Sequence, residues 1–254
     1  MRGRIYFIGG GPGDPSLITV RGMELLKGAS MVLASGIFME TYREHIGEKE
    51  CFDPFDLYHS ELVGRVDACL DRGLDVVFLV PGDLAIFSPV QSLIDYFGDA
   101  AVVVPGVSTL NAASAALKRT FDLPAVSHST IATSPKTITG SPDTVGELSK
   151  HKATMVLFMN NRAPEALSSE LSEGYAPETP VAVVYMVSLP EEEIQMTTVG
   201  SLATDVDRAR FEDEDVYKLV IVGPVLTARE DPSWWDKRKD MRDARHARKK
   251  AGLK

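Results

Sequence analysis

The chain has 254 residues, of which 44% are hydrophobic and 25% are charged. This composition is typical of a globular protein of one large or two modest domains, and it excludes the disordered, collagen-like and disulfide-scaffold classes. No apolar run approaches the roughly 20 residues that a membrane-spanning helix needs, so we expect no membrane segment.

The formal charge of −9 is unevenly distributed along the chain. Residues 229–254 contain ten Lys and Arg against five Asp and Glu, a net charge of +5, which leaves −14 on residues 1–228. An acidic body repels polyanions, so nucleic acid is not expected as its substrate. The basic tail fits either a solvated terminal helix or a segment that binds an anionic partner.

The N-terminus and the cysteines favour the cytoplasm. Arg2 and Arg4 lead directly into a short apolar run and a glycine cluster, without the features of a signal peptide. Cys51 and Cys69 form no CxxC pair and have no His pair beside them. We therefore expect neither a metal site nor a disulfide framework.

The first half of the chain alternates between short apolar runs and helical patterns. Strands are predicted at residues 5–8, 31–34, 75–80 and 101–104, and helices around Leu25 and Leu26 and at residues 62–70, 90–97 and 110–117. Continuous apolar strands that alternate with helices predict an α/β domain, in which helices cover both faces of a parallel sheet.

A domain boundary is predicted at the sequence Phe121-Asp122-Leu123-Pro124, where proline interrupts the pattern. The chain then divides into an N-terminal α/β domain (1–120), a C-terminal α/β domain (121–228) and a basic, helical tail (229–254). In the second domain we predict an alternating strand at 126–133, continuous apolar strands at 155–159 and 181–185, a last strand at 218–222, and a loop over a site at 135–148.

A glycine-rich loop, Gly-Gly-Gly-Pro-Gly-Asp-Pro at residues 9–15, follows the first strand, where α/β proteins bring their backbone close to a ligand. A dinucleotide fingerprint requires GxGxxG, but Asp14 occupies the third glycine position and would repel a pyrophosphate. No Gly-Lys-Ser/Thr of a Walker A loop follows either. A purely structural glycine turn remains an alternative.

The stretch FIGGGPGDPSLIT at residues 7–19 resembles the opening signature of the tetrapyrrole methylases, GxGPGDPxLIT. VPGDLAIF at 80–87 resembles the family's GDPxxY/F loop, and VVPGVS at 103–108 matches a third element. Further along, LPAVSHSTIATS, ATMVLFM and TPVAVVY resemble the branch that methylates C11 of precorrin-4. The resemblance covers about residues 4–226 and leaves the tail outside.

This resemblance implies two α/β domains, a homodimer, a tetrapyrrole substrate, and S-adenosylmethionine bound in the cleft between the domains. It assigns no catalytic residue and no metal ligand. Asp83 would place a carboxylate near the sulfonium or ammonium group of the cofactor. Met159 and Ala182 fit equally well as core residues. The cofactor contacts that the resemblance implies are Pro12, Gly82, Asp83, Ile86, Ser108, Thr109, Met159 and Ala182.

Several positions depart from the family pattern on the expected substrate side. Leu84 stands for the proline of the GDP motif and Phe87 for the usual tyrosine. His128 and Ser134 replace a glutamine and an arginine of the C11-methylating branch. Lys136 offers a point charge rather than a bidentate guanidinium. These departures bear on the substrate more than on the reaction type.

Methyl transfer from a sulfonium is an in-line displacement, so it requires neither a nucleophilic triad nor a metal, only a near-attack geometry and the exclusion of water. His128 is a candidate base, although a structural role explains it as well. The basic lining that a carboxylate-rich substrate needs has the candidates Lys118, Arg119, Lys136 and Arg162.

Two other functions stay open at this point. One is methylation of another precorrin position or another substrate by the same fold. The other is a methylase-like module that binds a ligand or partner without catalysis, which the substrate-side departures and the basic tail favour.

Overall fold

The N-terminal domain contains a parallel sheet of five strands in the order β3-β2-β4-β1-β5. The computed structural model describes residues 2–138 and 143–250. Each of the four predicted strands is present, and the short β3 is an addition that the sequence did not reveal, because its side chains are only partly buried. The strands are β1 (Ile5–Gly9), β2 (Met31–Ala34), β3 (Glu50–Phe52), β4 (Val76–Val80) and β5 (Ala101–Val104).

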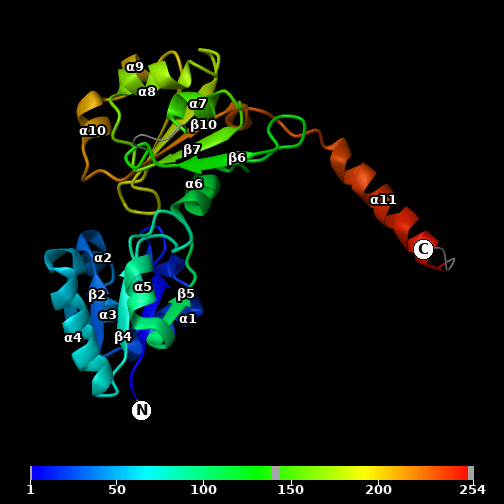
Figure 1. Cartoon of the computed structure of the whole chain (residues 1–254). Coiled ribbons are helices and arrows are strands. Elements are labelled where there is room, and N and C mark those ends of the chain that lie inside the picture. Colours follow the sequence, from blue (N-terminus) through cyan, green and yellow to red (C-terminus); the bar gives the residue numbers. More distant parts are fainter. Residues whose placement is uncertain (1, 139–142, 251–254) are drawn as a thin grey trace.

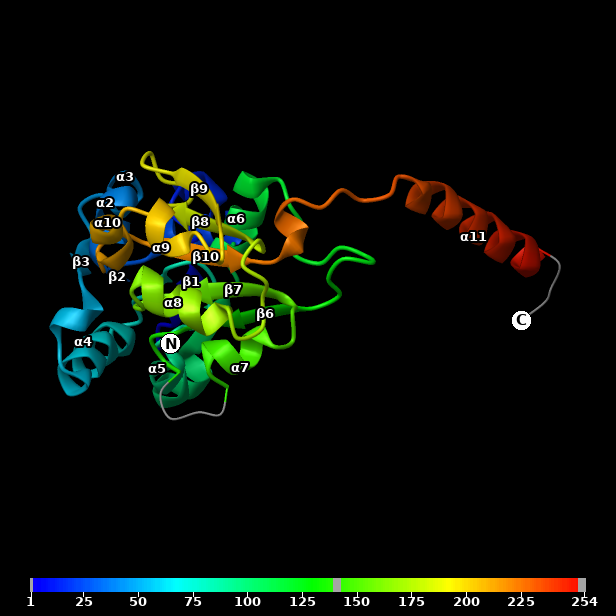
Figure 2. The same ribbon diagram turned by 90° about the horizontal axis from the view of Figure 1, so that it is seen from above.

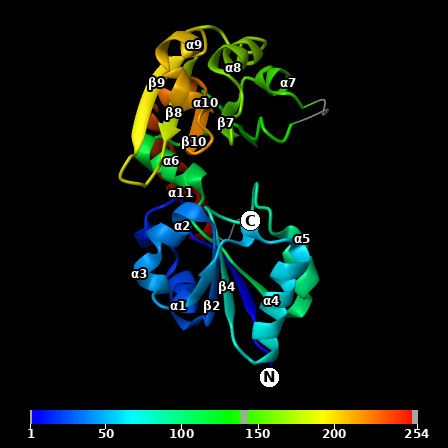
Figure 3. The ribbon, with the colours of Figure 1, turned by 90° about the vertical axis from the view of Figure 1, so that its left-hand side faces the viewer.

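Helices cover both faces of this sheet, as the continuous apolar strands predicted (Figure 3). Adjacent strand residues point to opposite faces, so Ile8 packs in the layer that contains α1 (Val20–Gly28), whereas Phe7 packs against the layer with α4 (His59–Asp71). The remaining helical elements of this domain are α2 (Gly36–Thr41), α3 (Arg43–Ile46), α5 (Gln91–Phe97), η1 (Pro15–Leu17), η2 (Pro54–Asp56) and η3 (Gly98–Ala100).

The C-terminal sheet has the order β6-β7-β10-β8-β9 and is mixed, since only β6 and β7 run parallel. Its apolar strands were predicted correctly, but their pattern reports burial on both faces rather than strand direction. The edge strand β9 was not predicted. The strands are β6 (Thr130–Thr133), β7 (Thr154–Phe158), β8 (Pro180–Tyr185), β9 (Glu193–Thr198) and β10 (Lys218–Val222).

One face of the second sheet packs against short helices and the other against α6 (Thr109–Leu117). The loop predicted at 135–148 is therefore only partly right, because α7 begins at Val145; residues 139–142 lie outside the described part of the chain. The short helices are α7 (Val145–Ser149), α8 (Pro164–Leu171), α9 (Leu202–Asp205) and α10 (Arg208–Glu212), and η4 (Pro224–Leu226) follows β10.

α6 links the two domains. It precedes the boundary predicted at residue 121, yet Ala112 and Ala113 share a buried cluster with Leu219 and Ile221 of β10. This packing favours a boundary before Thr109. The predicted helical tail is present as α11 (Ser233–Lys250), which extends away from both domains (Figures 1 and 2).

Tyr185 supplies a test of the second core. It is 1% exposed, and its hydroxyl has no hydrogen-bond partner among the described residues. Burial raises the pKa of Tyr185 to about 12. Below the unfolded pKa of about 10 this tyrosine is neutral in both states, so its ionisation does not change the stability. As the pH rises from 10 to 12 the unfolded state ionises first, and the free energy of unfolding falls.

We expect Tyr185→Phe to raise the free energy of unfolding by up to about 1 kcal/mol at pH 7. Above pH 10 the difference should widen by about 1.4 kcal/mol per pH unit, because only the wild-type unfolded state ionises at this position. Tyr175→Phe is the matched control, since the Tyr175 hydroxyl donates to the Ala153 carbonyl oxygen. That variant should lose about 1–3 kcal/mol at pH 7 in urea unfolding; equal effects of the two variants would contradict the prediction.

Candidate active site

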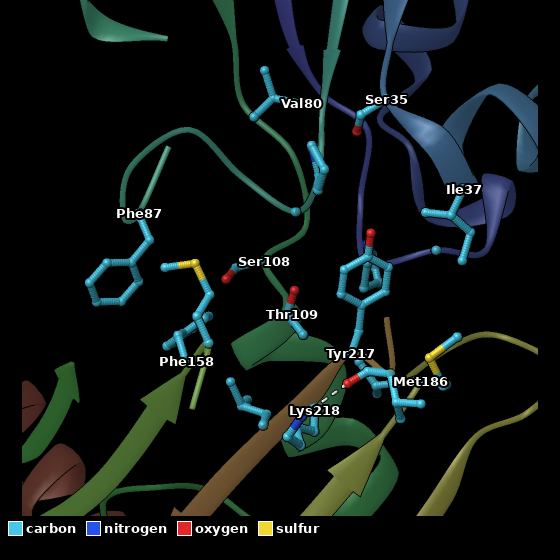
Figure 4. A pocket seen from close by; sticks show the side chains of 18 of the residues that line it. Ser35, Ile37, Val80, Phe87, Ser108, Thr109, Phe158, Met186, Tyr217 and Lys218 are labelled. Atoms are coloured by element: carbon cyan, nitrogen blue, oxygen red, sulfur yellow. Dashed lines mark hydrogen bonds between the residues drawn. The ribbon is translucent and has the colours of Figure 1, made fainter. Parts of the chain in front are cut away.

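A cleft of about 480 Å³ lies where the carboxyl ends of the first sheet face the second domain (Figure 4). In open α/β sheets this end of the strands is where ligands bind. The loops after β1 and β4 and the start of α6 form one wall. The ends of β7 and β8 and the start of β10 form the other, with Phe158, Met186 and Lys218 among the lining residues.

The first wall consists of three glycine loops in backbone contact. Gly11 and Gly82 exchange two hydrogen bonds, N to O, of 3.1 Å and 2.7 Å. A Cβ on Gly106 would lie 2.5 Å from the carbonyl oxygen of Gly9, and one on Gly9 would lie 2.6 Å from the Gly106 nitrogen. Only glycine permits this approach, and of these loop glycines Gly82 also lines the cleft.

In agreement with the prediction from the sequence, this loop does not have the structure of a dinucleotide-binding turn. The Asp14 side chain accepts a hydrogen bond from Ser16 N at 2.8 Å and caps the short η1. The first long helix begins only at Val20, where Thr19 Oγ1 accepts from Gly22 N. The first long helix therefore does not start at the glycines of this loop, as pyrophosphate binding in a dinucleotide fold would require.

Asp83 fixes the second and third loops to each other. Its Oδ1 accepts from Ala85 N and its Oδ2 from Gly106 N, both at 2.8 Å. Hydrogen bonds to an ionised acceptor are stronger than neutral ones. The Asp83 carboxylate thus positions two loops of the wall and also places a negative charge at the cleft.

The N-terminus of α6 opens into the cleft. Ser108 is its N-cap, and both Ser108 and Thr109 line the cavity. The positive end of a helix with two hydroxyls suits a carboxylate or another anionic group. The same cleft therefore offers a carboxylate on one loop and an anion-binding helix end beside it.

Three of the seven described non-glycine residues with a positive φ line the cleft. Phe87, Met159 and Met186 line it with φ angles of 56°, 46° and 46°. Non-glycine residues adopt this left-handed region at a cost, and such residues cluster at functional sites. The Phe87 and Phe158 rings, 5.0 Å apart, join the two domains across it.

Seven of the eight predicted contact residues line this cleft: Pro12, Gly82, Asp83, Ile86, Ser108, Thr109 and Met159. Ala182 does not. It is fully buried in the second core, on the same face of β8 as Val184, which does line the cleft two residues further along the strand.

The predicted basic lining is represented by Lys136, whose Nζ pairs with Glu214 at 3.1 Å. Arg119 instead donates to the Ala228 carbonyl oxygen at 2.7 Å, and Arg162 pairs with Glu170 at 3.1 Å. Lys118 caps the C-terminus of α6. These three are not among the residues that line the cleft.

His128 and the other departures lie outside the lining. His128 is exposed, and Ser134 is 1% exposed at the end of β6. Leu84 packs against the first core. Phe87 alone among the four faces the cleft, so His128 loses support as a base.

The sequence did not reveal Lys218. Its Nζ donates to the carbonyl oxygens of Asp213 and Val216 at 2.8 Å and 3.3 Å, and burial lowers the pKa of its ammonium group. In the sequence, nothing distinguishes a lysine at the start of an apolar strand from an ordinary surface lysine, so its place in the cleft could not be predicted. Tyr217, beside it, also lines the cleft (Figure 4).

The sequence model of the family "Tetrapyrrole (Corrin/Porphyrin) Methylases" matches residues 4–203. This chain is a tetrapyrrole methylase. The cobalt-precorrin-4 C(11)-methyltransferase of Methanocaldococcus jannaschii is 33% identical over 88% of each chain. The precorrin-4 C(11)-methyltransferase of Mycobacterium tuberculosis is 34% identical over 88% of this chain and 92% of that one.

Among solved structures, a cobalt precorrin-4 methyltransferase of cobalamin biosynthesis is 30% identical, with a TM-score of 0.79 over 89% of this chain and 96% of that one. This tetrapyrrole methylase therefore has the two-domain α/β fold of such enzymes. The family match includes the three glycine loops and ends before β10 and α11. Within residues 2–138 and 143–250 we find no cluster of metal ligands and no helix that is long and apolar enough to span a membrane.

Proposed function

We propose that this chain transfers a methyl group from S-adenosylmethionine to C11 of precorrin-4 or cobalt-precorrin-4. The observation that carries the proposal is the interdomain cleft at which the three glycine motifs meet, in a chain with 33–34% identity to relatives that carry these names. Some relatives are named for the cobalt form and others for the metal-free form, so the proposal includes both.

The cleft suits S-adenosylmethionine in size and chemistry. A cavity of about 480 Å³ lies in the range of small-molecule sites, about 300–1,000 Å³. The cofactor carries an ammonium, a carboxylate and a flat adenine. Asp83 complements a cation, the N-terminus of α6 complements a carboxylate, and the apolar side chains of Ile86 and Met159 suit a flat ring.

When bound, S-adenosylmethionine supplies an electrophilic methyl group. The protein positions and encloses the reactants. Seven residues would hold the cofactor: Pro12, Gly82, Asp83, Ile86, Ser108, Thr109 and Met159. Ala182 would support this wall only from within the core. Orientation of this kind contributes about 7–11 kcal/mol to lowering a barrier.

Exposed aromatic side chains make the remaining part of the cleft suitable for a flat macrocycle. Phe55 and Tyr217 both line the cleft, and they are 64% and 56% exposed. Lys136 and Lys218 bring positive charge to the same cavity, where a substrate with several carboxylates would need it. We expect the macrocycle to stack on the aromatic rings and to direct its carboxylates toward the lysines.

We further propose that the protein works in the cytoplasm as a homodimer. Cys51 and Cys69 are free thiols, which suits a reducing compartment. Val103 of β5 is 47% exposed, and within the described residues β5 is an edge strand with one unpaired side. Large exposed apolar residues beside an open edge favour association with another chain.

The decisive experiment supplies purified protein with S-adenosylmethionine and either precorrin-4 or cobalt-precorrin-4. We expect the mass of one product to increase by a single methyl group, with the new carbon at C11 by NMR. Titration with S-adenosylhomocysteine separates the alternatives. Binding without transfer to either substrate would favour another methylase reaction, whereas no binding to folded protein would overturn the methyltransferase proposal.

A further inference from the structure

None of the described residues of the basic helix α11 lines the cleft. Figures 1 and 2 show it extending from the second domain and standing clear of both domains. The family match ends at residue 203, well before it. Its side chains are exposed or partly exposed where described, including Trp235 and Met241 at 66% each.

The charges of α11 are sorted by face. At 100° per residue, Asp236, Asp240 and Asp243 form one stripe along the helix. Arg238, Arg242 and Arg245 form a second stripe on the opposite side, about 160° away. Trp234 and Trp235 flank the arginine stripe at its start, and Arg238 lies 5.3 Å from the Trp234 ring. We call this side the arginine–tryptophan face; it is built to bind an acidic surface.

Residues 191–215 provide such a surface on the second domain. They contain nine exposed Asp and Glu and two Arg, a net charge of −7. Hydrogen bonds hold the segment together as one surface: Thr197 Oγ1 donates to Asp205 at 2.6 Å, and Arg210 pairs with Glu193. The edge strand β9 adds Met196, 48% exposed, as an apolar contact for tryptophan.

We propose that the arginine–tryptophan face of α11 docks on the acidic surface 191–215 of a second copy of this chain. In the structure α11 stands away from the acidic surface of its own copy, since α9 and α10 lie on the side of the domain opposite to α11 (Figures 1 and 2). A net charge of −14 on residues 1–228 opposes nucleic acid and anionic lipid as partners.

Two copies can exchange these helices symmetrically, so that each α11 neutralises the acidic surface of the other copy. Glu214 belongs both to that surface and to the lining of the cleft. Docking would therefore bring cations of the second copy to the rim of the cleft. The contact is independent of the methyl transfer proposed above and of any dimer interface elsewhere on the domains.

The test uses full-length protein, mixed in equal amounts as ¹⁴N and ¹⁵N samples and treated with a carbodiimide, which joins lysine amines to carboxylates. We expect mass spectrometry to find α11 peptides joined to peptides of the acidic surface, with mixed isotopes. Cross-links within one isotope only, or none between these segments, would overturn the proposal. So would loss of the mixed cross-links on addition of duplex DNA or anionic vesicles, because these partners would then be preferred.

Charge reversal makes the test specific. Replacing Arg238, Arg242 and Arg245 with Glu should reduce the mixed cross-links about 10-fold, and replacing Glu191, Glu212 and Asp215 with Lys should do the same. A mixture of the two triple variants should restore them, since one copy of each restores an attractive pair. The matched control replaces Asp236 and Asp240 with Asn and should retain the cross-links. Failure of the mixture to restore them, with both variants folded, would contradict the proposal.

Discussion

Gly106→Ala is expected to lower the rate of methyl transfer by about 100-fold, because displacement of a positioning loop by about 1 Å has effects of this size. A Cβ at this position would lie 2.5 Å from the Gly9 carbonyl oxygen, which belongs to backbone and cannot rotate away. The third loop must therefore move away from the first, and Ser108 and Thr109 would move with it. We also expect a loss of about 1–3 kcal/mol in the free energy of unfolding.

The matched control is Gly64→Ala in the middle of α4, where an added Cβ meets nothing within 4 Å. This variant should keep wild-type activity and gain about 0.5–1 kcal/mol, since alanine is the better helix former. Rates measured at saturating substrate, with folding checked by circular dichroism, compare the two. Wild-type rates in folded Gly106→Ala would show that the contact between the loops does not position the cleft.

Asp83→Asn is expected to weaken the binding of S-adenosylhomocysteine about 10- to 100-fold. The carboxylate now accepts from two backbone N–H groups, Ala85 N and Gly106 N. An amide can accept only one of these and turns its own N–H₂ toward the other. Each hydrogen bond to a charged group contributes about 1.5–3 kcal/mol, and the negative charge that would face the cofactor is also lost.

Asp75→Asn serves as the control for this variant. Its Oδ1 accepts from Arg4 N at 2.8 Å, which is the same type of bond at the amino end of the same sheet, away from the cleft. Isothermal titration should give the wild-type affinity for Asp75→Asn. Equal affinities for Asp83→Asn and the wild type would remove Asp83 from the proposed site.

The strands were predictable because each signal is local. The apolar runs at β1, β4 and β10 each bury both faces, and such burial is written in consecutive residues. Strand direction in the second sheet was not predictable, since an antiparallel strand such as β8 in a sheet covered on both sides has the same apolar pattern as a parallel one. β9 was not predicted because it is an edge strand whose residues are mostly exposed or partly exposed, so it has no continuous apolar run.

The residues of the candidate site also divide into those that a local motif predicts and those whose position depends on the packing of the domains. Pro12, Gly82 and Ser108 were predicted because they belong to motifs of consecutive residues, and all three line the cleft. Ala182 was placed in the right strand, but the depth of a residue along a strand depends on where the other domain lies. Lys218 was missed for the same reason: a lysine at the start of β10 becomes part of a cleft only through the packing of the domains.

The sequence by itself determined the continuous apolar strands, the glycine motifs and the family of this protein, but not β3 and β9. Only the tertiary structure decided that the motifs meet. They follow β1, β4 and β5, and β1 lies between the other two in a parallel sheet, so the three carboxyl ends emerge side by side. Strand order results from long-range packing, which no local pattern of residues encodes. The same packing places the acidic surface of the second domain on the side away from α11.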